Sequence, residues 1–535
     1  PVIPITLDIS PLLRFQPLRL DDTLHLLSCC SAKTCDLDPM PSQLVKSVSV
    51  ELAPAMQMII NSSLQGGIFP QSFKNAIVTP RLKKPSLNPD TCSSYRPVSN
   101  LSFLSKATER AASDQLTHHL QQHNLLEPFQ SAYRSFHSTE TAMIRVHDDI
   151  CRAIGESKAV LLVLLDLSAA FDTVNHELLL SILAGYKVEG PALQWFSSYL
   201  ADRTQSVLVG CSTSDQQPLS CGVPQGSVLG PILFNVYTSS LGHLLRQKSV
   251  GYYIYADDTQ IYIAASPDRI DTAMQQMEEC IGLVSSWMSR HYLKLNQDKS
   301  EFLVLSSKPV ARQLQCPSLD VCGHLVPQNS FVKSLGVTID PNLSMEAHVG
   351  NICRVAYGQL HRISKVKKFL DQRSLECIIH AFITTRLDYC NGILCGVSSG
   401  LKKKLQRVQN SAARLLTNTR KREHITPVLR SLHWLPVEQR INFKVLVLTY
   451  KCLHGLAPDY LHELIQPYNP ACDLRSLNQT LLHVPFTMSE MVRTSAFSFV
   501  GPALFNQLPC DIRQSASLEI FKRRVKTHLF TLHYS

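Results

Sequence analysis

The chain has 535 residues, of which 44% are hydrophobic and 18% charged, a composition that excludes wholesale disorder and suggests two to four folded domains. Its apolar runs are too short to cross a bilayer and its 17 cysteines contain no C-x-x-C pair, so no membrane span, zinc finger or disulfide scaffold is expected. The formal net charge is +10, but residues 351–450 alone hold 18 Lys and Arg against 5 Asp and Glu, a local excess that suits a polymer of phosphates.

The first part of the chain is predicted to combine helices with one short strand. Residues 1–28 look like the end of a connector, and the absence of an opening Met or an apolar leader argues against secretion. A turn-rich stretch leads into a helix at about 41–64. A strand at 76–78 precedes a basic loop, and helical periodicity runs from about 103 to 123.

The next segment contains a strand that ends in a carboxylate. Residues 159–165 are continuously apolar, which is typical of a strand buried on both faces. The run stops at Asp166, where the strand must emerge and expose its side chain. A helix near 176–185 and a strand pair around 205–220 are predicted next, and the Gly- and Pro-rich loop 221–227 then opens onto an apolar helix.

The most informative feature is the tetrapeptide at 255–258, which ends in Asp257 and Asp258. Aromatic and β-branched residues flank it on both sides, so it reads as the tip of a hairpin. Adjacent carboxylates at such a tip repel each other and need a counter-ion, usually a divalent metal. Together with Asp166 they could converge on two Mg²⁺ ions. The alternative is a surface Asp and an exposed acidic turn in an unrelated α/β protein.

The remainder of the chain changes from strands to helices. A long amphipathic helix is predicted at 268–290, with short strands within 293–305 and 319–339. Beyond about residue 345 the pattern is helical with little strand signal. Three further segments are predicted: a helix at 438–454 that stops at Gly455, a loop-like stretch at 461–490 and a basic helix at 521–526.

Taken in order, six motifs resemble those of the reverse transcriptases of LINE-type (non-LTR) retrotransposons. The resemblance covers nearly everything from about residue 30 to the end. The motifs lie at 95–101, 166–172, 224–227, 255–258, 295–299 and 334–337.

The resemblance implies an α+β fold shaped as a right-hand polymerase. Residues 1–28 would be the connector, 29–345 the fingers and palm with an antiparallel sheet and helices, 346–460 a helical basic thumb, and 461–535 a C-terminal region of unknown role. The implied activity is RNA-directed DNA polymerisation, in which a DNA primer is extended on an RNA template from dNTPs with two Mg²⁺ ions, or with Mn²⁺ in their place.

The resemblance also assigns catalytic and metal-binding roles. Asp166, Asp257 and Asp258 would hold the two metal ions, although Asp258 could instead be a supporting carboxylate. Lys299 looks like the general acid for the pyrophosphate leaving group. The alternative for Lys299 is an ordinary solvated lysine.

Five residues match the family's nucleotide-binding positions. Lys84 and Arg96 would neutralise the incoming triphosphate, although Lys83 could serve as well as Lys84. Phe171 would close over the sugar and exclude a 2′-hydroxyl, unless it only packs in the palm. The other two, Gln225 and Gly226, would approach the template–nucleotide pair, where glycine permits close backbone contact.

Nucleic-acid contacts are implied further along the chain. Leu335 and Gly336 match the family's primer-gripping turn. A basic cluster would track the phosphate backbone without reading bases, unless it is only a solvated helix face. Its members are Lys402, Lys403, Lys404, Arg407, Lys421 and Arg422.

Two departures from the family pattern qualify this interpretation. Ala132-Tyr133 precedes Arg134 where the family usually has Gly-Phe. Family members usually carry an endonuclease upstream, and none is present in this sequence, which puts autonomous transposition in doubt.

Rival functions remain open at this point. One is a catalytically silent or host-recruited RNA-binding protein derived from a retrotransposon. Others are an RNA-dependent RNA polymerase, against which Phe171 argues, and a group II intron maturase. The free thiols and the resemblance lead us to expect an intracellular protein of the nucleus and of cytoplasmic ribonucleoprotein, without membrane contact. The sequence does not indicate an oligomeric state.

Overall fold

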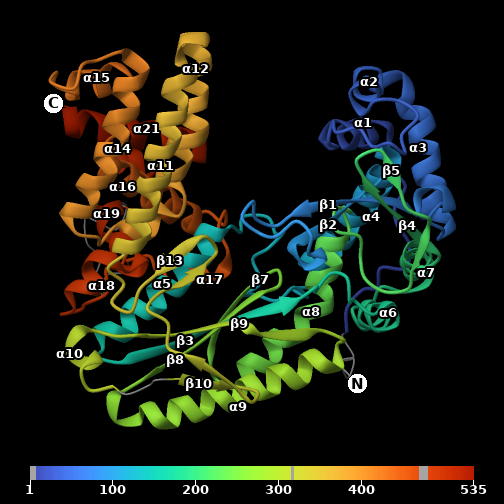
Figure 1. Cartoon of the computed structure of the whole chain (residues 1–535), viewed down its shortest axis with the longest axis horizontal. Coiled ribbons are helices and arrows are strands. Elements are labelled where there is room, and N and C mark those ends of the chain that lie inside the picture. The colour runs from blue at the N-terminus through green and yellow to red at the C-terminus, as the bar shows by residue number, and fades with distance from the viewer. Residues whose placement is uncertain (1–7, 315–317, 469–479, 535) are drawn as a thin grey trace.

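The computed structural model describes residues 8–314, 318–468 and 480–534. It mixes helices with mainly antiparallel sheets, as the predicted α+β class requires. Figure 1 shows an N-terminal lobe and a helical lobe on opposite sides of a central sheet, with a long helix beneath that sheet. In the part of the chain so described, no helix combines the length and apolar character that a bilayer span needs.

The central sheet has four strands in the order β7-β8-β3-β9, and all neighbours are antiparallel. Its central strand β3 confirms the strand predicted from the apolar run. Leu161, Val163 and Leu165 enter one hydrophobic core, whereas Val160 and Leu162 enter the other. The continuous apolar run therefore reflects burial on both faces. The strands are β3 (Ala159–Ser168), β7 (Gly251–Tyr255), β8 (Asp258–Ala265) and β9 (Lys294–Leu305).

Helices cover both faces of this sheet. One face packs on α8 (Gly230–Gln247) and α9 (Ile270–Arg290), of which α9 confirms the predicted amphipathic helix. The other face packs on α5 (Thr139–Gly155), which was not predicted. Its start is set by Ser138, whose hydroxyl accepts a hydrogen bond from the Thr141 amide.

The N-terminal lobe is built on a second sheet with the strand order β2-β1-β4-β5, in which β6 also pairs with β4. The strands are β1 (Asn75–Leu82), β2 (Tyr95–Asn100), β4 (Arg203–Val209), β5 (Ser212–Thr213) and β6 (Gln217–Leu219). The strands predicted at 76–78 and 205–220 are thus confirmed.

Six helices pack around that sheet and form the rest of the lobe. The helix predicted at 41–64 is present but interrupted, and its end is marked by Gly67 at φ +68°. Within the predicted connector, Phe15 is buried against Trp195 and Phe196. The helices are α1 (Leu20–Cys29), α2 (Ser42–Ser47), α3 (Ser49–Gly66), α4 (Phe103–Gln122), α6 (His176–Gly185) and α7 (Gly190–Leu200).

Short elements link the central sheet to the helical lobe. They are α10 (Lys308–Ala311) and two hairpins, β10 (Ser318–Val321) with β11 (His324–Pro327) and β12 (Val332–Ser334) with β13 (Val337–Ile339). These hairpins confirm the short strands predicted within 319–339.

The helical lobe begins at residue 346, as the loss of strand signal predicted. Its helices are α11 (Glu346–Val366), α12 (Gln372–Ile379), α13 (Thr385–Asp388), α14 (Ser399–Thr417), α15 (Thr426–Ser431) and α16 (Val437–Leu453). A π-helical turn at His380–Thr384 joins α12 to α13. Gly455, at φ +65°, follows the end of α16.

The C-terminal helices pack into the same core as α5 and α16. They are α17 (Asp459–His462), α18 (Glu490–Ser495), α19 (Phe497–Asn506), α20 (Cys510–Arg513) and α21 (Leu518–Tyr534), the last of which confirms the predicted basic helix. Residues 1–7 of the predicted connector and 469–479 of the predicted loop lie outside the described residues.

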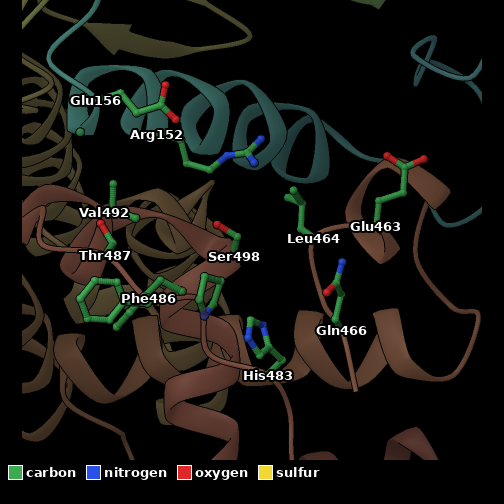
Figure 2. Close-up of a pocket in the computed structure, with 13 residues that line it drawn as sticks. Arg152, Glu156, Glu463, Leu464, Gln466, His483, Phe486, Thr487, Val492 and Ser498 are labelled. Carbon is green, nitrogen blue, oxygen red and sulfur yellow. The ribbon is translucent and has the colours of Figure 1, made fainter. Parts of the chain in front are cut away.

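Pockets lie at both ends of α5, and the one at its C-terminal end is shown in Figure 2. It has a volume of about 400 Å³ and separates the end of α5 from the C-terminal segment. Arg152 lies at its wall, but its guanidinium is already paired with Asp148 (3.1 Å) and Asp149 (2.7 Å). The cation in this pocket is therefore satisfied within the protein.

Truncation of the central strand should test the two-sided packing. We expect Leu162→Ala to lower the free energy of unfolding by about 2–5 kcal/mol, because Leu162 is fully buried and its loss leaves a cavity. Leu325→Ala is the matched control, since that side chain is 67% exposed and should change stability by less than about 0.5 kcal/mol. Urea unfolding measures both, and equal effects would contradict the packing described.

Candidate active site

Three aspartates meet at the end of the central sheet. Leu165 pairs with Thr259 across β3 and β8, so the next residue of β3 and the preceding residue of β8, Asp166 and Asp258, lie side by side. Asp257 occupies the turn between β7 and β8. Like charges directly opposite on neighbouring strands are destabilising, which makes this arrangement costly without a counter-ion.

The turn that carries Asp257 is held by a buried amide. Ala256 has a left-handed backbone, at φ +56°. Its amide donates to Oε1 of Gln130 (2.9 Å), and its carbonyl accepts from Nε2 of the same side chain (3.3 Å). Gln130 therefore fixes the turn as a positioning residue that the sequence analysis did not identify.

The electrostatics reflect this crowding of carboxylates. Lost hydration and the charge of Asp166 raise the pKa of Asp257. The positive charges of Arg96 and Lys299 oppose this rise. Although Asp258 is exposed on one side, lost hydration around its carboxylate, then the charges of Asp257 and Asp166, raise its pKa to about 6. The site thus holds more negative charge than its neighbouring cations balance.

Lys299 reaches Asp166 from a bulge in β9. Leu164 pairs with Glu301 and Asp166 pairs with Asn296, so the four residues 297–300 of β9 lie opposite Leu165 alone. Such bulges redirect side chains beside active sites. The Nζ of Lys299 lies 3.1 Å from Oδ2 of Asp166. The structure therefore brings the predicted general acid to the predicted metal ligands, while its role stays a prediction.

The chemistry of the three carboxylates fits a hard divalent cation. Mg²⁺ prefers oxygen ligands, and three aspartates supply them. In the described part of the chain, however, no group of three or more His, Cys, Asp or Glu side chains is arranged around a common metal position. Metal binding by Asp166, Asp257 and Asp258 remains a prediction.

The loop at 224–227 lies against β2 of the N-terminal lobe. The amide of Ser99 donates to the Gln225 carbonyl (2.7 Å), and the Gln225 side chain donates to both carboxylate oxygens of Asp172 (3.0 and 3.1 Å). Gly226 has φ +125°, and a Cβ there would lie 2.5 Å from the Ser99 carbonyl oxygen. The close approach at Gly226 is thus made within the chain, whereas its contact with a template–nucleotide pair stays a prediction.

A buried carboxylate holds the other side of this loop. Glu109 on α4 accepts hydrogen bonds from the amides of Val228 (2.7 Å) and Leu229 (3.2 Å). Burial raises the pKa of Glu109, and the charge of Arg203 and these amides oppose that rise. Glu109 is a second positioning residue that sequence analysis missed, because an acidic residue in a helix gives no signal of a tertiary partner.

The predicted triphosphate ligands lie on the β1–β2 hairpin. Arg96 is exposed on β2, and its positive charge opposes the rise in the pKa of Asp257 and of Asp258. Lys84 is exposed, and its side chain makes no ion pair within the described ranges. The charge of Lys83 opposes the rise that burial causes in the pKa of Asp172, and its ammonium donates to the Ser93 carbonyl (2.9 Å). The charge of Arg96 thus acts on the two carboxylates of the turn, and the choice between the two lysines stays open.

Phe171 is both packed and partly accessible. Its ring stacks on that of Phe234, with 4.4 Å between the centroids, and it is half-buried against the core. Its carbonyl accepts from the amide of Val223 (2.9 Å), which fixes its backbone. This arrangement suits a rigid ring beneath a bound sugar as well as a packing residue.

The predicted primer-gripping turn lies between β12 and β13. Leu335 and Gly336 have φ of +45° and +83°, and the hydroxyl of Tyr389 donates to the Leu335 carbonyl (2.6 Å). Tyr389, just after α13, is a further residue that the sequence analysis did not single out. It ties the turn to the helical lobe.

The predicted basic cluster is divided between α14 and the loop that follows it. Lys403, Lys404 and Arg407 are exposed on α14, and Lys421 and Arg422 are exposed in the loop. Lys402 differs, because its Nζ lies 3.0 Å from a carboxylate oxygen of Glu438. Five of the six predicted residues therefore present free charge to solvent.

Comparison with known proteins finds a family match over part of the chain. Residues 82–339 match the family described as "Reverse transcriptase (RNA-dependent DNA polymerase)". The expected resemblance is confirmed: the chain carries a reverse transcriptase domain, and its relatives are RNA-directed DNA polymerases of non-LTR retrotransposons.

Two relatives from Drosophila melanogaster illustrate the extent of similarity. The "Probable RNA-directed DNA polymerase from transposon BS" is 26% identical over 445 residues, which are 80% of this chain and 48% of that protein. The "RNA-directed DNA polymerase from mobile element jockey" is 27% identical over 354 residues, 64% of this chain and 37% of that protein.

A third relative comes from Bradysia coprophila. The "Retrovirus-related Pol polyprotein from type-1 retrotransposable element R1" is 24% identical over 371 residues, which are 68% of this chain and 36% of that protein. The chain thus spans about half or less of the length of these three relatives.

The contact at Gly226 gives a first test of the site's construction. We expect Gly226→Ala to displace the 224–227 loop from β2, because the added Cβ would collide with the Ser99 carbonyl. Gly323→Ala is the matched control, since Gly323 has φ +88° but open space around it, so it shares the backbone strain without the collision. Faster hydrogen exchange at Ser99 in the first variant only is the expected result, and equal exchange in both would contradict it.

The raised pKa of Asp258 predicts how metal binding depends on pH. Below about pH 6 this carboxylate is protonated, so a proton competes with a bound cation and the affinity for Mn²⁺ should fall. Each proton displaced corresponds to about a tenfold loss per pH unit. Calorimetric titration from pH 8 to pH 5 measures this. Asp258→Asn should bind more weakly with a shallower dependence, and a flat wild-type profile would contradict the assignment.

Proposed function

We propose that this chain is an RNA-directed DNA polymerase that extends a DNA primer on an RNA template from dNTPs. The observation that carries the proposal is the meeting of Asp166, Asp257 and Asp258 beside Arg96 and Lys299 at the end of the central sheet. The match of residues 82–339 to the reverse transcriptase family supports it. RNA, DNA and dNTPs are the partners that this activity requires.

We also propose the right-hand arrangement for the whole chain. Residues 29–345 would form fingers and palm, with the active site on the central sheet. Residues 346–460 would form the thumb, since they are helical and hold most of the excess positive charge. The position of the two lobes on opposite sides of the sheet supports this division (Figure 1).

The three aspartates would hold two Mg²⁺ ions, or Mn²⁺. When bound, such ions lower the energy of the charge that develops on the attacking and leaving oxygens. Arg96, beside the carboxylates, would bind the triphosphate through its forked guanidinium. Lys299 would release Asp166 and donate a proton to the departing pyrophosphate.

Two features would position the substrates around this centre. Phe171, stacked on Phe234, would form the wall that a 2′-hydroxyl cannot pass. The turn at Leu335 and Gly336, tied to Tyr389, would support the primer end. Exposed charges at 403–407 and 421–422 would follow the phosphate backbone.

Primer extension by the purified chain tests the proposal. We expect extension with RNA template, DNA primer, dNTPs and Mg²⁺, and a loss of about 10³-fold or more in Asp257→Asn, because metal ligation supplies several kcal/mol of transition-state stabilisation. Asp268→Asn is the matched control, since that carboxylate is 75% exposed and lies beyond the far end of β8, opposite the end that carries Asp258. Wild-type protein that binds RNA without extension would favour the silent RNA-binding alternative instead.

Sugar selection gives a second test. We expect Phe171→Val to raise ribonucleotide incorporation relative to deoxyribonucleotide by about tenfold or more, a change of about 1.4 kcal/mol. Competition between each rNTP and its dNTP on one template measures the ratio. If the variant is only less stable and its selectivity is unchanged, Phe171 is a packing residue.

A further inference from the structure

A second pocket lies between the start of α5, the middle of α16 and the start of α21. We call it the lysine pocket, and its volume is about 350 Å³. Residues 136–141, 443–457 and 522 contribute to its walls, so it joins the palm, the thumb and the C-terminal region. None of the predicted site residues lines it.

The lysine pocket holds positive charge that the protein does not balance. Lys444, Lys451 and Lys522 line it, all half-buried, against one lining carboxylate, Glu140. Glu140 lies 2.8 Å from Lys444, and Lys522 lies 2.8 Å from Glu519, which is 81% exposed. Within residues 8–314, 318–468 and 480–534 no carboxylate oxygen lies within 4.0 Å of Lys451 Nζ. In contrast to Arg152 in the pocket of Figure 2, Lys451 is an unsatisfied cation.

The same lysines repel one another. Burial, followed by the charges of Lys522 and Lys444, lowers the pKa of Lys451. A bound anion would reverse this, because it would supply an opposite charge to Lys451, whereas Lys444 and Lys522 are each paired with one carboxylate. The geometry of the pocket therefore favours an anionic ligand.

Exposed aromatic rings lead from this pocket to the active site. Phe136 lines the pocket and is 58% exposed, and Tyr133, three residues earlier, is also 58% exposed. Both have left-handed backbones, at φ +65° and +60°, which are unusual for bulky side chains. Arg134 fixes the loop, since its guanidinium donates to the carbonyls of Glu127 (2.6 Å) and Gln130 (3.0 Å). The protein thus holds two rings toward solvent in a strained but fixed conformation.

This loop begins at the catalytic hairpin. Phe129 and Ser131 pair with the edge of β7, because the Ile254 amide donates to the Phe129 carbonyl (3.0 Å) and the Ser131 amide donates to the Ile254 carbonyl (3.1 Å). Burial, followed by the charge of Asp257, raises the pKa of Tyr133. The loop from Phe129 to Phe136 therefore connects the edge of β7, which leads to Asp257, with the lysine pocket.

We propose that the lysine pocket binds the sugar–phosphate backbone of a nucleic-acid strand that is engaged at the active site. The three lysines hold phosphate, and Phe136 stacks on a base, as exposed aromatic residues do in single-strand binding sites. This inference rests on the proposed polymerase function. It gives the C-terminal region a role, because α21 supplies Lys522.

Photo-crosslinking tests where the strand lies. A DNA primer annealed to an RNA template carries one 5-iodouracil, placed at successive distances from the primer end in either the primer or the template. We expect one strand to crosslink to the peptide that contains Phe136, and the arm that does so identifies that strand. The full chain is used without dNTPs, so no extension is needed.

Binding titrations test the lysines. We expect the double change Lys451→Gln and Lys522→Gln to weaken binding by about tenfold at low salt and to flatten the salt slope by up to about two units. Arg523→Gln, an exposed neighbour on α21, is the control for charge.

The aromatic ring is tested by crosslinking. We expect Phe136→Ala to reduce the crosslink, and Phe486→Ala, at an 89% exposed ring, is its control.

Two results would overturn the strand site, and a third would separate it from the polymerase proposal. Equal affinity for pocket variants and controls, with no crosslink in either arm, would overturn the strand site. Competition by inorganic phosphate as effective as that by the primer–template would also overturn it and indicate a small-anion site. If the wild type fails to extend primers but the crosslink and the lysine dependence persist, the polymerase proposal fails and the strand site stands.

Discussion

Repulsion between aspartates that the strand pairing forces together is the constraint on which the site depends. The register of β3 and β8 leaves Asp166 and Asp258 side by side, and Asp257 follows in the adjoining turn. Such crowding persists only where the surrounding structure holds it. Here the bulge of β9 brings Lys299 to Asp166, and the side chain of Gln130 holds the turn at Ala256. The site is therefore built before any substrate arrives.

The central strand also joins the two cores of the molecule. Because β3 is buried on both faces, a shift in either core would move the end that carries Asp166. The C-terminal helices share one of these cores, and Tyr460 reaches through it to the hairpin strand. Its hydroxyl forms hydrogen bonds with Tyr253, Ser131 and Thr141 (each 2.9 Å). Helix α17 is thus tied directly to β7, the strand that leads into the turn of Asp257.

The sequence predicted the elements whose signal is local. The apolar run of β3, the aromatic strands around Asp257 and the amphipathic α9 each carry a periodicity that packing does not override. Helix α5 was missed although its buried Met143, Val146 and Ile150 keep helical spacing. The bulge at 297–300 and the contact of Gly226 with Ser99 depend on the register and on tertiary approach. The lysine pocket could not be predicted, since Lys451 and Phe136 are far apart in the sequence.

Diffraction from crystals that contain Mn²⁺ tests the central claim most directly, because the anomalous signal locates the ion independently of activity. We expect manganese among the carboxylates of Asp166, Asp257 and Asp258, with the ammonium of Lys299 displaced from Asp166. Lys299→Met should bind the ion at the same place, since it removes only the competing cation. Manganese found elsewhere, with the pair between Lys299 and Asp166 intact at saturating metal, would contradict the account.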